Sequence, residues 1–106
     1  MTQVQGAPLK LSISRGMKHE VTIPHDLEPI DLSAERQARW WEAAEQLGAA
    51  GLGLRMELVE VARDPSRHML RRAGRAARYA EQHVAGLEQQ IANAVATEIE
   101  DAAETG

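Results

Sequence analysis

The sequence predicts a mainly α protein of the α+β class, in which an N-terminal β-hairpin precedes a long antiparallel α-helical hairpin. Three observations predict it. Apolar and polar positions alternate over residues 9–23, apolar residues recur at helical spacing over 33–63 and again over 66–103, and a proline stands at position 65 between the two helical stretches. With 106 residues, 43% of them hydrophobic and 26% charged, the chain is expected to form a single domain over residues 1–106.

The β-hairpin is predicted over residues 9–23. Leu9, Leu11 and Ile13 lie on one face of a first strand, and Val21 and Ile23 fall on the same face of a second. A short connection between the strands would set Ile13 opposite Val21, which keeps that face apolar. Because an isolated hairpin is only marginally stable, its apolar face must pack on another part of the protein.

An extended linker follows over residues 24–32, where Pro24 and Pro29 disfavour helix in the residues before them. Ser33 is the predicted N-cap of a helix over residues 33–63. The apolar seam of that helix repeats at steps of four and three residues and consists of Trp40, Ala44, Leu47, Gly51, Leu54, Leu58 and Val61. The seam favours one continuous helix. A break between Gly48 and Gly53 is the alternative, because an interior glycine costs up to about 1 kcal/mol.

A second helix is predicted over residues 66–103, after the Asp64-Pro65-Ser66 turn. Its seam has the same spacing and consists of Leu70, Ala73, Ala77, Ala80, Val84, Leu87, Ile91 and Ala94. Antiparallel pairing would set large side chains against small ones. Ala92, Val95, Ile99 and Ala102 lie off this seam and suggest a contact with the β-hairpin or another protomer. Since a rod of about 45 Å is too thin to form its own core, we expect a homo-oligomer.

The charge is polarised along the chain, whose formal net charge is −4. Residues 55–78 carry seven arginines and three acidic residues, whereas residues 79–106 carry six acidic residues and neither Lys nor Arg. On one continuous second helix this order opposes the helix dipole, which favours anions at the N-terminus and cations at the C-terminus. A bound anion, or the acidic end of a neighbouring protomer, would account for it.

The arginines form one face of the second predicted helix. Arg71, Arg75 and Arg78 are spaced four and three residues apart, and all lie off the apolar seam. Arginine is suited to bidentate contacts with phosphate or carboxylate groups. The alternative interpretation is a solvated face that keeps the protein soluble. The candidate ligand-binding residues are Arg67, Arg71, Arg72, Arg75, Arg78, Tyr79 and His83, the last two for stacking or a hydrogen bond.

No enzyme signature is present, so we expect a non-enzymatic protein without a cofactor. The chain has no cysteine, and its four histidines show no metal-ligand spacing, so no metal site is predicted. The glycines of GAAGLG lie in a helical pattern and do not follow a strand as in a phosphate-binding loop. No run of 18 apolar residues and no signal pattern are present, so we expect a cytoplasmic protein that does not contact a membrane.

The segment DPSRHMLRRAGRAARYAEQHVAG, residues 64–86, resembles the second helix of the phage helical-hairpin sponges that sequester cyclic-nucleotide or cyclic ADP-ribose signals from bacterial CBASS and Thoeris defence. The shared features are the Pro-Ser-Arg turn at 65–67, the basic Arg75 eight positions later, and an alanine-rich helix packed on a preceding one. The predicted β-hairpin, the glycine-rich first helix and the additional arginines depart from that pattern. The resemblance implies a non-enzymatic oligomer, acting in the host cytoplasm, in which Arg67 contacts the phosphates of the ligand.

Three function hypotheses follow. The leading one is a small binding protein of phage or mobile-element origin whose arginine face sequesters a phosphate-bearing ligand such as a cyclic nucleotide. The alternative is a protein-interaction module, a phage inhibitor of a host protein or an assembly adaptor, that docks its basic face on an acidic partner. A DNA-binding regulator ranks third, because the net negative charge and the acidic C-terminal segment would weaken binding to DNA.

Overall fold

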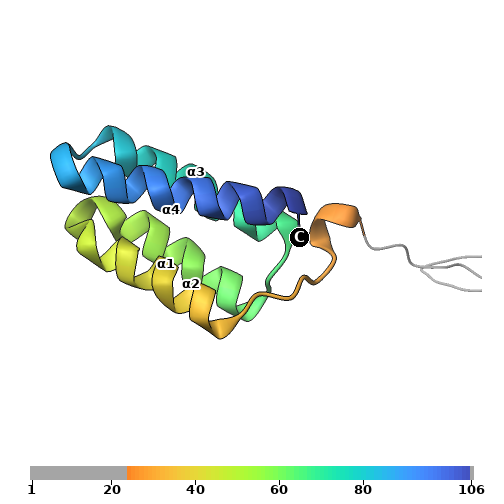
Figure 1. The fold of residues 1–106 in the computed structure, drawn as a ribbon. Helices are drawn as coiled ribbons and strands as arrows, with labels where there is room; N and C mark the ends of the chain where they lie inside the picture. Colours follow the sequence, from red (N-terminus) through yellow and green to blue (C-terminus); the bar gives the residue numbers. More distant parts are fainter. Residues whose placement is uncertain (1–23, 106) are drawn as a thin grey trace, which may run out of the picture.

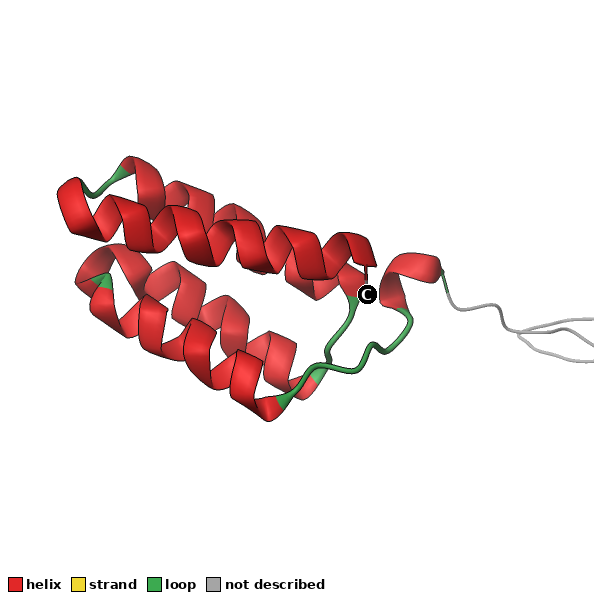
Figure 2. Ribbon diagram, in the orientation of Figure 1, coloured by secondary structure: helices red, strands yellow, loops and turns green. Residues whose placement is uncertain are grey.

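A computed structural model describes residues 24–105 of the protein. The described part is helical (Figure 2). Its elements are the 3₁₀ turn η1 (His25–Leu27), α1 (Ala34–Gln46), the 3₁₀ turn η2 (Gly48–Gly51), α2 (Leu52–Arg63), α3 (Arg67–Gln82) and α4 (Gly86–Thr105). The mainly α prediction is therefore confirmed, and the predicted β-hairpin at residues 9–23 lies outside the described residues.

The four α-helices are arranged as two helical hairpins that lie one against the other (Figure 1). Helices α1 and α2 form one hairpin, and α3 and α4 form the second. The two tight turns lie at the same end of the molecule. The opposite end carries the α2–α3 link, the C-terminus and the segment that leads into α1.

The prediction of one continuous helix over residues 33–63 is wrong. Helix α1 ends at Gln46, and the chain turns back through Gly48, whose φ of 60° lies in the left-handed region that favours glycine. Gly51 then packs against α1, where an added Cβ would lie 2.2 Å from the carbonyl oxygen of Ala44. The break falls within the glycine-rich stretch that the sequence offered as the alternative.

The continuous second helix over residues 66–103 is also wrong. Helix α3 ends at Gln82, and Gly86, with a φ of 62°, opens α4. The predicted apolar seam therefore does not continue across this turn, since Leu87 is 71% exposed and Val84 is only half-buried. The off-seam strip of α4, which we expected to contact the β-hairpin or another protomer, is instead part of the core. All four residues of the strip are buried, and Ala96 and Ala103 of α4 are buried beside them.

The two breaks fold the predicted rod in half. Helix α2 still packs on α3 and α1 still packs on α4, as a long hairpin requires, and the breaks add the α1–α2 and α3–α4 contacts. The first predicted seam is buried along its full length, from Trp40 to Val61. Four short helices thereby enclose the core that one thin pair of helices would leave exposed.

Helix α3 approaches α4 closely at Gly74, the small residue that lies at their contact. An added Cβ at Gly74 would lie 3.4 Å from Cγ of Glu100 and 3.7 Å from a methyl group of Ile99, so glycine here leaves little space between the helices. Short side chains thus bring the polar edges of the two helices within reach of each other.

Two serines and one backbone contact fix the opposite end of the bundle. Ser33 caps α1 as predicted, its hydroxyl oxygen accepting from the Arg36 N–H at 3.1 Å, and the buried Ser66 caps α3 by accepting from the Met69 N–H at 3.2 Å. Within the predicted linker 24–32, the Ile30 N–H donates to the Pro65 carbonyl oxygen at 2.9 Å. This hydrogen bond ties the incoming chain to the α2–α3 link.

Candidate anion-binding groove

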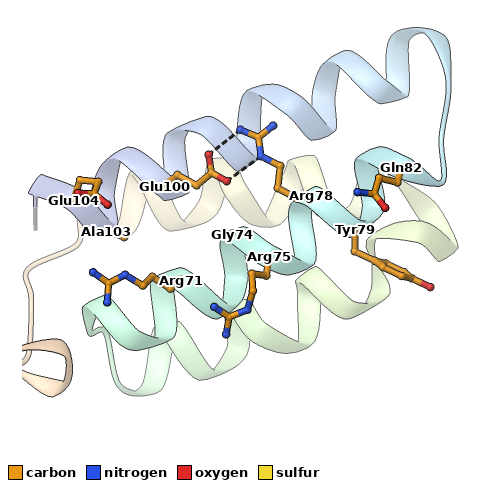
Figure 3. A pocket seen from close by; sticks show the side chains of 9 residues that line it. All are labelled: Arg71, Gly74, Arg75, Arg78, Tyr79, Gln82, Glu100, Ala103 and Glu104. Atoms are coloured by element: carbon orange, nitrogen blue, oxygen red, sulfur yellow. Dashed lines mark hydrogen bonds and ion pairs between the residues drawn. The ribbon is translucent and has the colours of Figure 1, made fainter.

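A groove of about 460 Å³ runs along the α3–α4 hairpin and gathers most of the predicted arginine face (Figure 3). Basic side chains line its α3 side, acidic ones line its α4 side, and Gly74 and Ala103 contribute small residues between them. The lining residues are Arg71, Gly74, Arg75, Arg78, Tyr79, Gln82, Glu100, Ala103 and Glu104. Four of the seven predicted ligand-binding residues, Arg71, Arg75, Arg78 and Tyr79, are among them.

Arg78 is held by α4. Its guanidinium donates to both carboxylate oxygens of Glu100, from Nε at 2.9 Å and from Nη2 at 2.7 Å, and Figure 3 shows this fork. Nη1 also donates to Glu81 at 3.0 Å and to the side-chain oxygen of Asn93 at 2.8 Å. These hydrogen bonds raise the pKa of Arg78 and lower the pKa of Glu100. Arg78 therefore joins α3 to α4 and is largely occupied within the protein.

Arg75 differs from its neighbours on α3. Its side chain is exposed, and it makes no hydrogen bond or ion pair with any other residue of the described part. Arg71, one turn earlier, forms an exposed ion pair with Asp26 at 2.6 Å. Since exposed ion pairs contribute little, about 0–1 kcal/mol, Arg71 can exchange Asp26 for another anion at small cost. Among residues 24–105, the groove thus has one guanidinium without a partner, that of Arg75, and a second that is weakly held, that of Arg71.

Arg67 lies outside the groove and binds backbone. Its Nη1 donates to the carbonyl oxygens of Ala103 and Glu104, at 3.2 Å to the latter. These carbonyls belong to the last turn of α4, where a helix leaves its acceptors unpaired and its dipole favours a cation. Arg67 is one of the predicted ligand contacts, and within the described residues it caps the C-terminal end of α4.

The remaining predicted ligand-binding residues, Arg72, Tyr79 and His83, lie on the side of α3 toward α2. Arg72 forms a forked ion pair with Glu57 of α2, with both N···O distances at 3.2 Å. Tyr79 is 62% exposed and its ring lies 4.2 Å, centroid to centroid, from the ring of His83, whose Nδ1 approaches the Tyr79 carbonyl oxygen at 2.9 Å. Tyr79 and His83 also line a depression of about 560 Å³ between α2 and α3. Tyr79 therefore stands on the ridge between this depression and the groove.

The fold explains why the charge order opposes the helix dipole. Because α3 and α4 are antiparallel, the basic N-terminal half of α3 lies beside the acidic C-terminal half of α4. The contacts of Arg67 with the end of α4 and of Arg78 with Glu100 connect these halves. We expected a bound anion or a neighbouring protomer to supply the opposite charge, and within residues 24–105 the same chain supplies much of it.

Sequence reasoning missed the acidic side of the groove. The predicted continuous helix over residues 66–103 places Glu100 and Ala103 at its far end, and Glu104 just beyond it, remote from the arginines. The signal that could have located them was Gly86, together with the shift of the apolar pattern to a new phase after it. A helix break at that glycine brings residues 100–104 alongside residues 67–78.

Comparison with known proteins identifies no family for this chain. No protein-family model matches the chain, and neither a curated protein nor a solved structure shows significant similarity to it. Among residues 24–105, no helix is both long and apolar enough to cross a membrane. The same residues contain no group of three or more potential ligand side chains that could hold a metal ion.

Proposed function

We propose that this protein is a small, non-catalytic binding protein that captures a phosphate-bearing ligand in the α3–α4 groove. The observation that carries the proposal is Arg75, the one arginine of the predicted face without a partner among the described residues, which lines a groove of about 460 Å³. An unpaired arginine offers a planar set of N–H donors that matches a phosphate group.

The neighbours of Arg75 support a ligand with both an anionic group and a ring. Arg71 adds a second cation whose exposed pair with Asp26 can be exchanged. Tyr79 presents an exposed ring at the same groove, and a base can stack on such a ring. A nucleotide, including a cyclic nucleotide signal, combines these two chemistries. Sequestration of such a signal in the cytoplasm, by a protein of phage or mobile-element origin, would agree with the resemblance of residues 64–86 to phage sponges.

The acidic side of the groove limits the charge of the ligand. Glu104 is exposed, and Glu100 is already bound to Arg78. A ligand with several phosphates would meet these carboxylates, and like charges repel. We therefore expect one phosphate to contact Arg75 while the uncharged parts of the ligand lie along Gly74 and Ala103.

Isothermal titration calorimetry tests the proposal. The full chain would be titrated with a panel of cyclic di- and trinucleotides, with adenosine monophosphate, and with inorganic phosphate. We expect saturable binding of a nucleotide, and a dissociation constant at least about tenfold higher for Arg75→Glu, since a charge-assisted hydrogen bond contributes about 1.5–3 kcal/mol. Absence of heat with every member of the panel would overturn the proposal.

Arg72→Gln is the matched control for this experiment. Arg75→Gln, measured beside it, removes the same single charge from the same helix, but Arg72 contacts Glu57 of α2 and does not line the groove. We expect Arg72→Gln to bind like the unmodified chain and Tyr79→Ala to bind more weakly. Equal losses for Arg75→Gln and Arg72→Gln would mean that net charge, and not the groove, determines binding.

The protein-interaction module remains the second candidate. The exposed pair between Arg71 and Asp26 favours it, because an acidic partner protein could replace Asp26 as readily as a phosphate could. A pull-down from host lysate should then retain an acidic partner that Arg71→Glu and Arg75→Glu lose. A DNA-binding regulator ranks third, since Arg67, Arg72 and Arg78 are engaged within the chain and fewer arginines remain for phosphates of the backbone.

A further inference from the structure

Exposed apolar side chains gather on the α1–α2 hairpin. Leu52, Met56 and Val59 are 52%, 65% and 49% exposed and follow one another at helical spacing on α2. They lie on the side away from the buried Leu54 and Leu58. Three large apolar residues on one exposed helix face form a stripe, in contrast to a single exposed residue, and such stripes mark contact surfaces.

A shallow groove lies beside this stripe, between α1 and α2. It has a volume of about 340 Å³ and no charged residue in its lining. Trp41, 37% exposed, forms part of its α1 side. The lining residues are Ala34, Gln37, Ala38, Trp41, Leu58, Val61 and Ala62. The stripe and the groove together make one apolar surface on the α1–α2 hairpin, which we term the α1–α2 face.

The charges at the border of the α1–α2 face are complementary between its two helices. On α1, Glu35 and Glu42 are exposed, lie seven residues apart, and form no ion pair within the described residues. On α2 the cations are Arg55, which has no partner in residues 24–105 and a buried Nε without an acceptor, and Arg63, which has an exposed contact of 3.3 Å with Glu60. Within the described residues, α1 thus presents two unpaired acids to this border, and α2 presents the unpaired Arg55 and the weakly paired Arg63.

This distribution fits a second copy of the same face. Residues 34–41 of α1 and residues 58–62 of α2 line the same groove, and the two helices are antiparallel (Figure 1). Glu35 at the start of α1 and Arg63 at the end of α2 therefore belong to the same end of the hairpin, and Glu42 and Arg55 both lie closer to the turn. A two-fold axis parallel to the helices would set α1 of one copy on α2 of the other. Each acid would then meet a base, twice per dimer, because a two-fold interface repeats every contact.

We propose that the protein forms a symmetric homodimer through the α1–α2 face, with the stripe and Trp41 buried at its centre and the Glu42 and Arg55 side chains paired across it. The dimer leaves the α3–α4 groove open, since that groove lies on the other helical hairpin. The inference is therefore independent of the proposed ligand.

Light scattering on the full chain, combined with size-exclusion chromatography, tests the dimer. We expect a dimer at tens of micromolar, and a dimer dissociation constant at least about tenfold higher for Met56→Glu, because central apolar residues contribute most to interfaces. Leu87→Glu, at a 71% exposed position of α4, is the control and should leave the dimer intact. A strict monomer, or a dimer that Met56→Glu does not weaken, overturns the proposal.

Charge reversal distinguishes this interface from other occupants of the face. Glu42→Arg alone and Arg55→Glu alone should each weaken the dimer, whereas an equimolar mixture should restore it as a heterodimer, because both cross-pairs are then acid with base. Failure of the mixture to recover the dimer would overturn the predicted arrangement. A monomeric chain that Met56→Glu destabilises toward heat would also overturn it, and would indicate that residues 1–23 of the same chain cover the face.

Discussion

The two helical hairpins of this protein differ in the residues that lie between their helices. Between α3 and α4, Gly74 leaves little space beside Ile99 and Glu100, and the helices lie close enough for Arg78 to reach Glu100. Between α1 and α2 an apolar groove remains beside Trp41, and a stripe of large apolar residues is exposed. Small residues thus close one hairpin within the chain, while large ones leave the other with a surface suited to a partner.

The largest effects should come from truncating core leucines. Leu70 of α3 and Leu54 of α2 are both 0% exposed, so replacing either by alanine should cost about 2–5 kcal/mol of unfolding free energy. We expect Leu70→Ala to lower the unfolding free energy more than Leu54→Ala does. The side chains around Leu70 on the closely packed α3 can move less into the new cavity than those around Leu54 on α2, which lies beside a groove. Urea unfolding followed by circular dichroism measures both. A larger cost at Leu54 would reverse the comparison, and Leu87→Ala, at an exposed position, should change stability by less than about 0.5 kcal/mol.

Two glycines at the start of α2 should respond in opposite directions to alanine. At Gly51 the new methyl group would collide with the Ala44 carbonyl oxygen, so we expect a loss of about 1–3 kcal/mol. At Gly53, inside α2, nothing lies within 4 Å of the added Cβ, and the higher helix propensity of alanine should stabilise by up to about 1 kcal/mol. Thermal unfolding of the two variants is the measurement. Equal shifts in Tm would mean that η2 does not hold Gly51 against α1.

Removing the cross-helix ion pair of the α3–α4 hairpin should have a smaller effect. Arg78 and Glu100 are 36% and 45% exposed, so solvent screens the pair, and we expect Arg78→Gln to cost about 1 kcal/mol at neutral pH. The hydrogen bonds from Arg78 hold the pKa of Glu100 below its usual 4.5. A carboxylate with a lowered folded pKa stabilises the fold above pH 4.5, and this contribution is lost as the pH falls through the lowered pKa.

The pH dependence provides the check on that pair. Unfolding free energies of the unmodified chain and of Arg78→Gln should converge as the pH is lowered below 4.5, because the protonated Glu100 no longer distinguishes them. A gap that stays constant down to acid pH would show that Arg78 stabilises the fold through packing and not through charge.

The smallest expected effect is a change in the pKa of Glu98, at the contact between the two hairpins. The Nε1–H of buried Trp40 donates to Glu98 of α4 at 3.0 Å, and this hydrogen bond is the main cause of the lowered pKa of Glu98, with Arg39 adding a second. Trp40→Phe removes the donor, so the pKa of Glu98 should rise toward its usual value in an NMR titration. Trp41→Phe is the control, since Trp41 donates to Glu45 instead. An unchanged pKa in Trp40→Phe would rule out this contact in solution.

The sequence predicted the helices and one complete core seam, but not the two tight turns. Spacing identified every buried position from Trp40 to Val61, because the turn at Gly48 happens to preserve the phase of the seam. At Gly86 the phase changes, and Leu87 and Ala94 were placed in the core although both are exposed. Periodicity reports which residues share a face only within one helix, and a glycine at positive φ cannot be distinguished from an interior glycine by spacing alone.

The candidate site could be predicted only in part, because the spacing of residues describes one helix at a time. The arginine positions were read from α3 alone, which is sufficient to group Arg71, Arg75 and Arg78. The partners of Arg71, Arg72 and Arg78 come from elsewhere in the chain: Asp26 before α1, Glu57 on α2 and Glu100 on α4. Which arginine stays unpaired depends on these tertiary contacts, and no local pattern in α3 singles out Arg75.

The two glycine turns share one end of the bundle, and both ends of the described chain lie at the other (Figure 1). This arrangement suits circular permutation of residues 24–105, because a linker could join residue 105 to residue 24 while new termini open at Gly48 or Gly86, away from the contact between Ile30 and Pro65. A permutant opened at Gly86 would separate α3 and α4 along the chain but keep them adjacent in space. Its stability would measure how far their packing depends on being consecutive.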